Sequence, residues 1–405
     1  MKRTAIIMAF WLVCGVVAAD DPPGPAWVPD LLTEQEATEG FYPLFNGKDL
    51  DGWWQGRAAK NAFAVEDGNL VVTHARGGGW LFFDREYQNY VLRLEYRCKP
   101  HAKSNSGVSI RATREGDPAF TGMEVQVLYP EKVPSKGSAG ALYASVAPNA
   151  KADKPEGEWN SLEILCDGPR IRTLMNGKEL YDISVHDFAQ RQDDYLPLAK
   201  RPRSGYIALQ DYGTPIAFRN IRLKPLPGGP GWRPLFNGRS LDGWEVVRDP
   251  IWSVSEDHTV RCDGTTGWDQ GRNALRTTEE FDNFEMRLSA KLSNHANSGV
   301  FFRCSGDDPW PRTYESQLDN HDPRQFTGAI WDQNPATELR AMDNCWLHMH
   351  IVANGPNIEI AVNGKVVNQY LSPKHDKFTK GWITLQGHDP KSVVEFKDIE
   401  IKTVP

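Results

Sequence analysis

The chain has 405 residues, which is too long for one ordinary domain and suits two. Its hydrophobic fraction of 40%, charged fraction of 24% and net charge of -7 are typical of a mildly acidic globular protein. There is no Lys/Arg-rich run and no basic stripe interleaved with aromatic residues, which argues against a nucleic-acid partner.

The N-terminus has the pattern of an export signal, which we assign to residues 1–19. Lys2 and Arg3 give a positive start, an apolar run follows, and Ala18 and Ala19 supply small residues for cleavage. The apolar run is shorter than the roughly 20 residues that a spanning helix needs. We therefore expect a periplasmic or secreted protein with no membrane span.

Residues 20–39 form a Pro-rich, acidic lead-in, expected to be a loose wrap or stalk in which 31–37 could form a turn or two of helix. After cleavage, five cysteines remain at different places in the two halves of the chain. An odd number without repeat symmetry does not predict a disulfide framework. We expect most of them to be buried small apolar residues in strands.

An internal repeat organises the rest of the sequence. Leu44–Trp53 (LFNGKDLDGW) returns as Leu235–Trp244 (LFNGRSLDGW). Further matched segments follow in the same order: Asn105–Gly107 with Asn297–Gly299, Glu124–Gln126 with Glu315–Gln317, Asn176–Gly177 with Asn363–Gly364, and Ile207–Gln210 with Ile383–Gln386. The chain is therefore a duplication, with a first domain at 40–226, a Pro/Gly linker at 227–232 and a second domain at 233–405.

Each repeat carries the signals of short antiparallel strands. Residues 90–97 alternate apolar and polar side chains with period two, as a half-buried strand does. Asn-Gly at 176–177 and 363–364 follows such alternation, and this pair is the strongest short hairpin signal because both residues tolerate positive φ. The pattern predicts an all-β protein made of sandwiches or barrels.

The repeated motifs resemble those of the 3-keto-disaccharide hydrolase family, formerly a domain of unknown function. The opening Leu44–Trp53 segment, the Asn-Ser-Gly and Glu-x-Gln segments and the closing strand at 218–221 carry this resemblance over nearly all of the mature chain. It implies two tandem concanavalin A-like jelly-roll β-sandwiches, each with a concave ligand-binding face. It also implies cleavage of glycosides whose sugar carries a ketone at C3.

That activity would need a separate sugar 3-oxidoreductase to make the ketone, because no nicotinamide or flavin motif is present. We expect no cofactor, and leave open a divalent metal. Asp319, His321 and His388 are the residues that could ligate it or act as acid and base. The alternative is that all three are ordinary polar residues of exposed loops.

The chemistry requires a base, a group that holds an enolate oxygen and an acid. Glu124 and Glu315 are the candidate bases or acceptors for substrate hydroxyls, each two residues before a Gln on one face of a strand. The alternative is an ordinary strand face exposed to solvent. Arg111 and Arg303 follow the Asn-Ser-Gly segments and could polarise the ketone or pair with the glutamates. His388 completes the predicted catalytic set, and repeat one has Asp211-Tyr212 in its place.

The residues predicted to bind substrate are polar side chains near these groups. For the two asparagines, turn chemistry is the first interpretation and sugar contact the second. They are Gln126, Gln317, Asn105, Asn297, Gln210, Gln386 and Lys154. Trp residues expected in or beside loops are candidates for stacking on sugar rings. They are Trp54, Trp80, Trp268, Trp310 and Trp331.

Two other functions fit the sequence. A concanavalin-like sandwich can serve a non-catalytic, lectin-like carbohydrate-binding protein as readily as an enzyme. A cell-surface adhesion module, in which one repeat only supports the other, is the third alternative.

Overall fold

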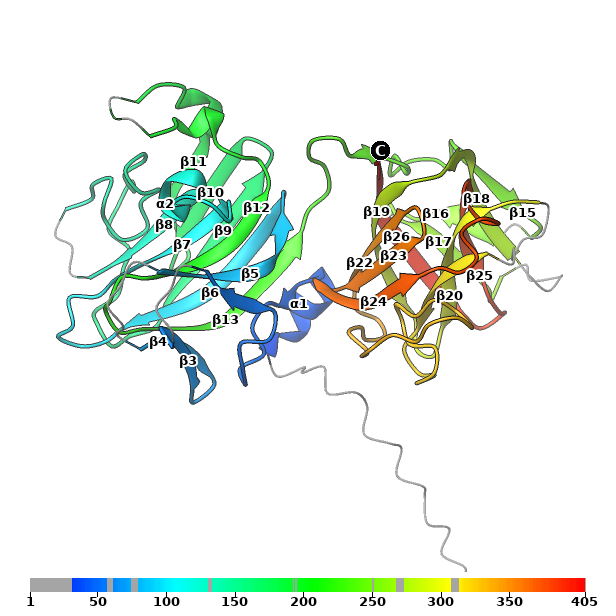
Figure 1. Ribbon diagram of the computed structural model, residues 1–405, viewed down its shortest axis with the longest axis horizontal. Coiled ribbons are helices and arrows are strands. Elements are labelled where there is room, and N and C mark those ends of the chain that lie inside the picture. The colour runs from blue at the N-terminus through cyan, green and yellow to red at the C-terminus, as the bar shows by residue number, and fades with distance from the viewer. Residues whose placement is uncertain are drawn as a thin grey trace, which may run out of the picture.

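The computed structural model describes residues 31–56, 61–73, 79–129, 133–191, 193, 195–249, 251–266, 273–306 and 313–404. Two β-sandwiches lie side by side, the first coloured blue to green and the second green to red (Figure 1). The predicted export signal at 1–19, Trp268 and Trp310 lie outside the described residues.

The first sandwich packs an eight-stranded sheet on a five-stranded sheet. The larger sheet has the order β11-β10-β9-β6-β13-β4-β3, with β1 beside β13. Its strands are β1 (Tyr42–Pro43), β3 (Phe63–Glu66), β4 (Asn69–Val72), β6 (Tyr90–Cys98), β9 (Asn160–Asp167), β10 (Arg170–Met175), β11 (Lys178–Ser184) and β13 (Ile216–Pro225). The smaller sheet has the order β2-β5-β12-β7-β8, with β2 (Trp53–Gln55), β5 (Gly79–Tyr87), β7 (Asn105–Ala112), β8 (Met123–Leu128) and β12 (Gly205–Asp211).

The second sandwich repeats this arrangement strand for strand. Its larger sheet has the order β24-β23-β22-β19-β26-β17-β16, with β14 beside β26. The strands are β14 (Arg233–Pro234), β16 (Trp252–Val254), β17 (Val260–Asp263), β19 (Phe284–Leu292), β22 (Leu347–Asn354), β23 (Asn357–Val362), β24 (Lys365–Leu371) and β26 (Val393–Thr403). The smaller sheet is β15 (Trp244–Val247), β18 (Asn273–Phe281), β25 (Gly381–Gly387), β20 (Asn297–Cys304) and β21 (Tyr314–Asp319). The predicted fold class, two tandem all-β jelly-roll sandwiches, is confirmed.

The predicted hairpins lie where Asn-Gly occurs. Asn176 and Gly177 have φ of 52° and 75° and join β10 to β11, while Asn363 and Gly364 have φ of 47° and 79° and join β23 to β24. Positive φ at both central residues gives the turn twist that matches the twist of the strands.

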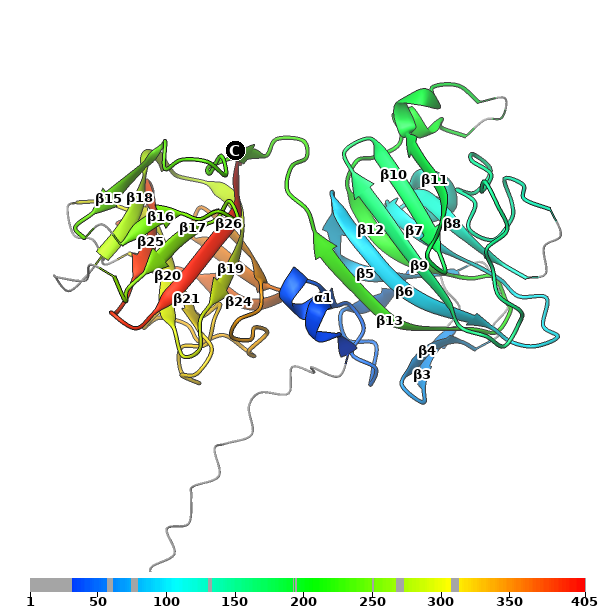
Figure 2. The same cartoon turned by 180° about the vertical axis from the view of Figure 1, so that it is seen from behind.

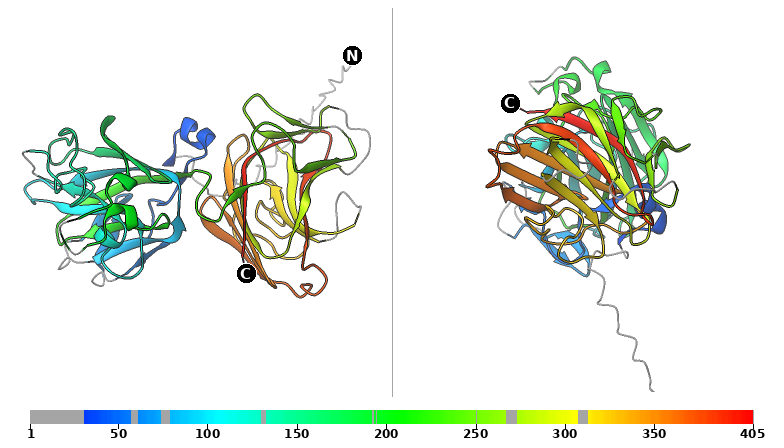
Figure 3. Two further views of the ribbon diagram at one scale, coloured as in Figure 1. Left: turned by 90° about the horizontal axis from the view of Figure 1, so that it is seen from above. Right: turned by 90° about the vertical axis from the view of Figure 1, so that its right-hand side faces the viewer.

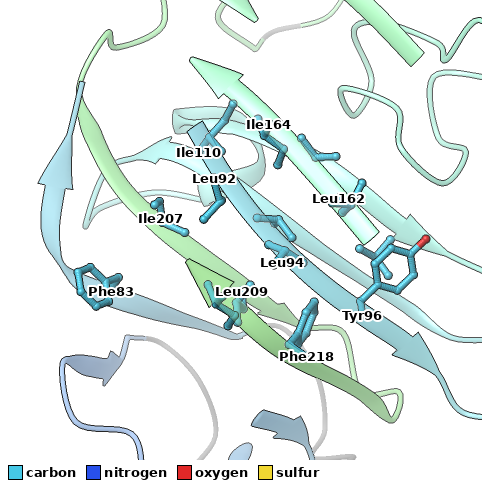
Figure 4. Packing of buried hydrophobic residues seen from close by; sticks show 14 of the residues in the cluster. Phe83, Leu92, Leu94, Tyr96, Ile110, Leu162, Ile164, Ile207, Leu209 and Phe218 are labelled. Atoms are coloured by element: carbon cyan, nitrogen blue, oxygen red, sulfur yellow. The ribbon is translucent and has the colours of Figure 1, made fainter. Parts of the chain in front are cut away.

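The core of each sandwich lies between its two sheets. In repeat one, Leu92 and Leu94 of β6 and Ile164 of β9 meet Ile207 and Leu209 of β12 (Figure 4). Four of the five cysteines in the two sandwiches are buried in strands, as predicted, and all five are free thiols: Cys98, Cys166, Cys262, Cys304 and Cys345. None of the helices in the described parts of the chain is long and apolar enough to cross a membrane.

Helices are few and short: α1 (Glu34–Glu39), α2 (Pro118–Thr121), η2 (Val185–Asp187) and η3 (Leu198–Lys200). The end of the lead-in folds as α1, which overlaps the turn or two of helix predicted at 31–37. Thr33 and Glu36 form a capping box at the start of α1, and buried Glu36 pairs with Arg222 at 2.7 Å. Figures 2 and 3 show α1 between the two sandwiches.

The two sandwiches are joined by polar contacts as well as by the linker. Nε2 of His348 lies 2.9 Å from the carbonyl oxygen of Gly40, and its Nδ1 lies 3.0 Å from Oγ of Ser289. Because the carbonyl can only accept, Nε2 carries the proton. Lys365 of repeat two also pairs with Asp51 of repeat one.

Candidate active site

The candidate bases occupy the same place in the two sandwiches. Glu124 lies on β8 and Glu315 on β21, at one edge of each smaller sheet. Val125 and Val127 point into the core of repeat one, so Glu124 and Gln126 face outward by alternation. Both glutamates are nevertheless buried, with 2% and 5% of their surface exposed.

In repeat one, the outer face carries a row of directly paired residues. Glu124 pairs with Ser109, Ser109 with Ala208, and Ala208 with Phe82. Directly paired residues in antiparallel strands place their side chains on the same face. The next row contains Gln126 opposite Gly107, with Gln210 and Trp80 paired farther along. The corresponding row of repeat two contains Glu315, Phe301, Thr384 and Arg276.

The Asn-Ser-Gly segments are the first residues of β7 and β20, so their interpretation as turns is wrong. The glycine has a steric reason in both repeats. A Cβ added at Gly107 would overlap the carboxyl group of Glu124, and one at Gly299 would overlap that of Glu315. Each carboxyl group therefore lies over a glycine of the neighbouring strand.

Burial changes the acidity of both glutamates. Desolvation, supplemented by the charge of Asp117, raises the pKa of Glu124 to about 8. Desolvation also raises the pKa of Glu315 to about 8, partly opposed by a hydrogen bond with Gln386. A carboxyl group with such a pKa exchanges its proton near neutral pH, as a general base does.

Several buried oxygens on these faces have no hydrogen-bond partner among the described residues. In repeat one they are Oε1 of Glu124, Oε1 of Gln126 and Oδ1 of Asn105. In repeat two they are Oε1 of Glu315, Oε1 of Gln317 and Oε1 of Gln386. The Glu and Gln oxygens are equivalent in the two repeats, whereas the third acceptor differs. Buried polar atoms are normally paired, so these unpaired acceptors indicate a site for a ligand rich in donors.

The structure corrects the predicted role of the two arginines. Arg111 and Arg303 have φ of 54° and 55° at bulges, which break the alternation of β7 and β20. Arg111 donates to the carbonyl oxygens of Gln88 and Gly168, and Arg303 to those of Asp282 and Gly355, at 2.8 to 3.0 Å. Each guanidinium group thus holds a turn that links the two sheets and a second turn within the larger sheet, and the predicted pairing with the glutamates is wrong.

A family model describing a 3-keto-alpha-glucoside-1,2-lyase-like domain matches residues 40–224 and again residues 231–402. The chain belongs to this family. Within it, a 3-keto-disaccharide hydrolase from Bacteroides thetaiotaomicron is 24% identical over 242 residues, which are 49% of this chain and 82% of the relative.

Solved structures of similar shape match one lyase-like domain at a time. A glycosyl-hydrolase candidate from Parabacteroides distasonis has 24% identity and a TM-score of 0.43, covering 48% of this chain and 98% of its own. The carbohydrate-binding module CBM66 from Bacillus subtilis has 14% identity and a TM-score of 0.32, covering 40% of this chain and 96% of its own.

Some of the other predicted site residues of the lyase-like domains share a face with the glutamates, and others do not. Gln210 and Gln386 lie on the same outer faces. Asn297 donates to Asp319 at 3.1 Å and accepts from Gln317 at 3.3 Å. Exposed Lys154 donates instead to the carbonyl oxygen of Trp159, at 3.0 Å, just before β9 of the larger sheet.

The two histidines predicted as site residues each contact a carboxylate. Nδ1 of His388 lies 3.0 Å from Oδ2 of Asp389, and Nε2 of His321 lies 2.7 Å from Oδ2 of Asp343. In the part of the chain that the structure describes, no three His, Cys, Asp or Glu side chains are grouped to hold a metal ion.

The tryptophans predicted in or beside loops lie at different kinds of position. Trp54 and Trp80 lie in β2 and β5, close to the ends of these strands, and Trp54 stacks on Phe82 at 4.5 Å. Trp331, in contrast, is 51% exposed in the loop after β21.

Two features of the lyase-like domains were missed from the sequence. The first is the place of an aromatic residue directly beside each glutamate. The backbone N–H of Tyr143 donates to the carbonyl oxygen of Glu124, and that of Trp331, predicted only as a residue that could stack on a sugar ring, donates to that of Glu315. The repeat alignment pairs Tyr143 with Trp331, and this pairing was the available signal. A cavity of about 630 Å³ between the sandwiches was also missed, because it joins residues distant in sequence. Its walls include ion pairs such as Arg287 with Glu400 at 2.9 Å, and neither candidate base.

Proposed function

We propose that this protein hydrolyses glycosides whose sugar ring carries a ketone at C3. The family description and the name of the Bacteroides relative support this substrate class. The observation that carries the proposal is the set of unpaired buried acceptors around each raised-pKa glutamate. A sugar brings several hydroxyl donors that would satisfy such acceptors.

The reaction follows from the acidity of the proton on C2, which the neighbouring ketone increases. The carboxylate of Glu124 or Glu315 removes that proton, and the resulting enolate expels the C1 substituent with the electron pair of the C1–O bond. Water then adds to the enone, with hydroxide at C1 and a proton at C2. Elimination alone is a lyase reaction and elimination followed by hydration is a hydrolysis, so both family names describe this chemistry.

The negative charge on the C3 oxygen needs a hydrogen-bond donor in the elimination step. We assign this role to the side-chain amides that share the face with each base: Gln126 and Gln210 in repeat one, and Gln317 and Gln386 in repeat two. Arg111 and Arg303 are not assigned to it, because turn carbonyls hold their guanidinium groups.

The cellular setting is part of the proposal. The positive start and short apolar run of residues 1–19 support export to the periplasm or the medium. The substrate ketone would be made by a separate enzyme of the class that oxidises a sugar hydroxyl at C3.

Product release from 3-keto-trehalose and 3-keto-glucosides tests the function. We compare wild type with Glu124→Gln, Glu315→Gln and the double variant, and use exposed Glu66→Gln as the matched control. The double variant is expected to lose at least about 100-fold in kcat, the scale of general-base catalysis, whereas the control keeps full turnover. A parallel series with chelator tests for a metal. Sugar binding by wild type without turnover of any keto-sugar would overturn the hydrolase and support a two-site lectin.

A further inference from the structure

The segment that follows β8 extends the smaller sheet beyond the candidate base. The backbone N–H of Tyr143 donates to the carbonyl oxygen of Glu124 at 2.8 Å, and that of Gln126 donates to the carbonyl oxygen of Ala141 at 2.9 Å. Leu142 forms a β-bridge with Val125 between them. This pairing places the side chains of Tyr143 and Glu124 next to each other on the outer face.

A strained turn directly after Tyr143 holds this residue in place. Ala144 has a φ of 53°, and Leu142 forms a second bridge with Val146, four residues later. A left-handed conformation at an alanine costs on the order of 1 kcal/mol and persists only where surrounding contacts impose it. Asp332 has the same φ of 53° in the corresponding turn of repeat two, after Trp331.

The surroundings of Tyr143 keep its phenol protonated. It is half-buried, its ring centroid lies 5.9 Å from that of Phe120, and the ring of Phe120 stacks on Tyr195 at 3.6 Å. Burial raises the pKa of Tyr143, with further contributions from the negative charges of Glu124 and Asp117. When Glu124 accepts a proton its charge disappears, so the phenol becomes a better acid at the moment when the leaving group needs a proton.

We propose, on the basis of the hydrolase function above, that Tyr143 is the proton donor to the departing glycosidic oxygen in repeat one. The C2 proton moves to the carboxylate of Glu124, the C1–O bond breaks, and the phenol proton of Tyr143 moves to the released oxygen. Water then supplies hydroxide to C1 and a proton to the phenolate, and Glu124 returns its proton to C2. The net charge of the pair is unchanged at each stage.

Trp331 occupies the corresponding position of repeat two and has no acidic hydroxyl. A phenol can therefore donate a proton beside the base in repeat one, whereas repeat two lacks a hydroxyl at this position. Proton donation is needed when the leaving group is a sugar alcohol, which is a poor anion. It is not needed when the leaving group is 4-nitrophenolate, which departs as a stable anion.

The test uses a full-length Glu315→Gln parent, in which only repeat one can turn over. In this parent, Tyr143→Phe is expected to lower kcat for 3-keto-trehalose at least about 100-fold. It should change kcat for the 4-nitrophenyl 3-keto-glucoside less than about 3-fold, since phenylalanine keeps the ring and removes only the hydroxyl. Tyr370→Phe in the same parent, which removes the phenol hydroxyl of a half-buried residue of β24 in the larger sheet of repeat two, is the control and should leave both rates unchanged.

Equal loss on both substrates would show that Tyr143 positions the sugar, and would overturn its role as an acid. No loss on either substrate would overturn it as well. Absence of turnover by the parent on both substrates would instead remove the hydrolase function of repeat one, and the inference with it.

Discussion

The carboxyl group of Glu124 lies over the backbone of Gly107 on the neighbouring strand, in space that any side chain at Gly107 would fill. Glu315 has the same relationship to Gly299. The two glycines thus determine where the candidate bases lie, although neither carries a functional group.

Gly107→Ala, made in the Glu315→Gln parent, should displace the Glu124 carboxyl group and lower kcat by at least about tenfold, because a shift on the order of 1 Å can cost more than that. Gly107 does not have a positive φ, so the backbone itself tolerates alanine. Gly137→Ala, in a more open position, is the matched control. Full turnover by Gly107→Ala with an unchanged thermal midpoint would contradict the steric account.

The raised pKa of each glutamate has a cost in stability at high pH. Each carboxyl group has a pKa of about 8 in the folded protein and an ordinary value of 4.5. Between these values only the unfolded chain ionises, so the free energy of unfolding falls as pH rises. Glu124→Gln should therefore stabilise repeat one at pH about 9, by up to about 4 kcal/mol, and by much less near pH 5. Urea unfolding at the two pH values measures the difference. An equal effect at both would rule out a buried, raised-pKa carboxyl group.

Arg111→Lys and Arg303→Lys should lower the free energy of unfolding and leave turnover nearly unchanged. Lysine cannot reach both turns at once, so each variant leaves buried carbonyl oxygens unpaired at a cost of about 2 to 4 kcal/mol. Turnover per folded molecule should stay within about twofold of wild type. Arg239→Lys, at an exposed site, is the control in urea unfolding. A loss of turnover without a loss of stability would restore the arginines to the active site.

Acid should weaken the contact between the sandwiches. Burial lowers the pKa of His348 to about 4, so its neutral form is the one that fits between Gly40 and Ser289. The contribution of His348 to the stability of this contact is complete above its ordinary pKa of 6.5 and is lost as pH falls through about 4. Small-angle X-ray scattering should show an increase in radius of gyration over this window. His348→Gln, which keeps an N–H donor and does not titrate, should delay the increase. A wild-type radius that stays constant down to pH 4 would contradict the prediction.

Much of the fold could be predicted because its signals are local. The Asn176–Gly177 hairpin, the alternating strand at 90–97 and the duplication each depend on residues close together or on a direct sequence match. The same alternation placed Glu124 beside Gln126 on one face. The carboxylates could therefore be proposed as a site before their surroundings were known.

The arginines and the Asn-Ser-Gly segments could not be predicted in this way. The direction of Arg111 depends on a bulge with positive φ, and its partners lie in turns 23 and 57 residues away. Gly107 lies in a strand because it pairs with Gln126 of β8, and it is a glycine because Glu124 lies over it, whereas propensity alone favours a turn. Both features depend on contacts between elements that local patterns do not encode.

The last strand of each repeat has a consequence for biosynthesis. β13 and β26 are made last but lie inside the larger sheets, between β6 and β4 and between β19 and β17. A growing chain therefore exposes two unpaired strand edges until residues 216–225 have emerged, and again until 393–403 have emerged. Because the two gaps have the same strand order, the closing strand of one copy can compete for the place of the other. Correct assembly then depends on the first copy closing before the second is complete.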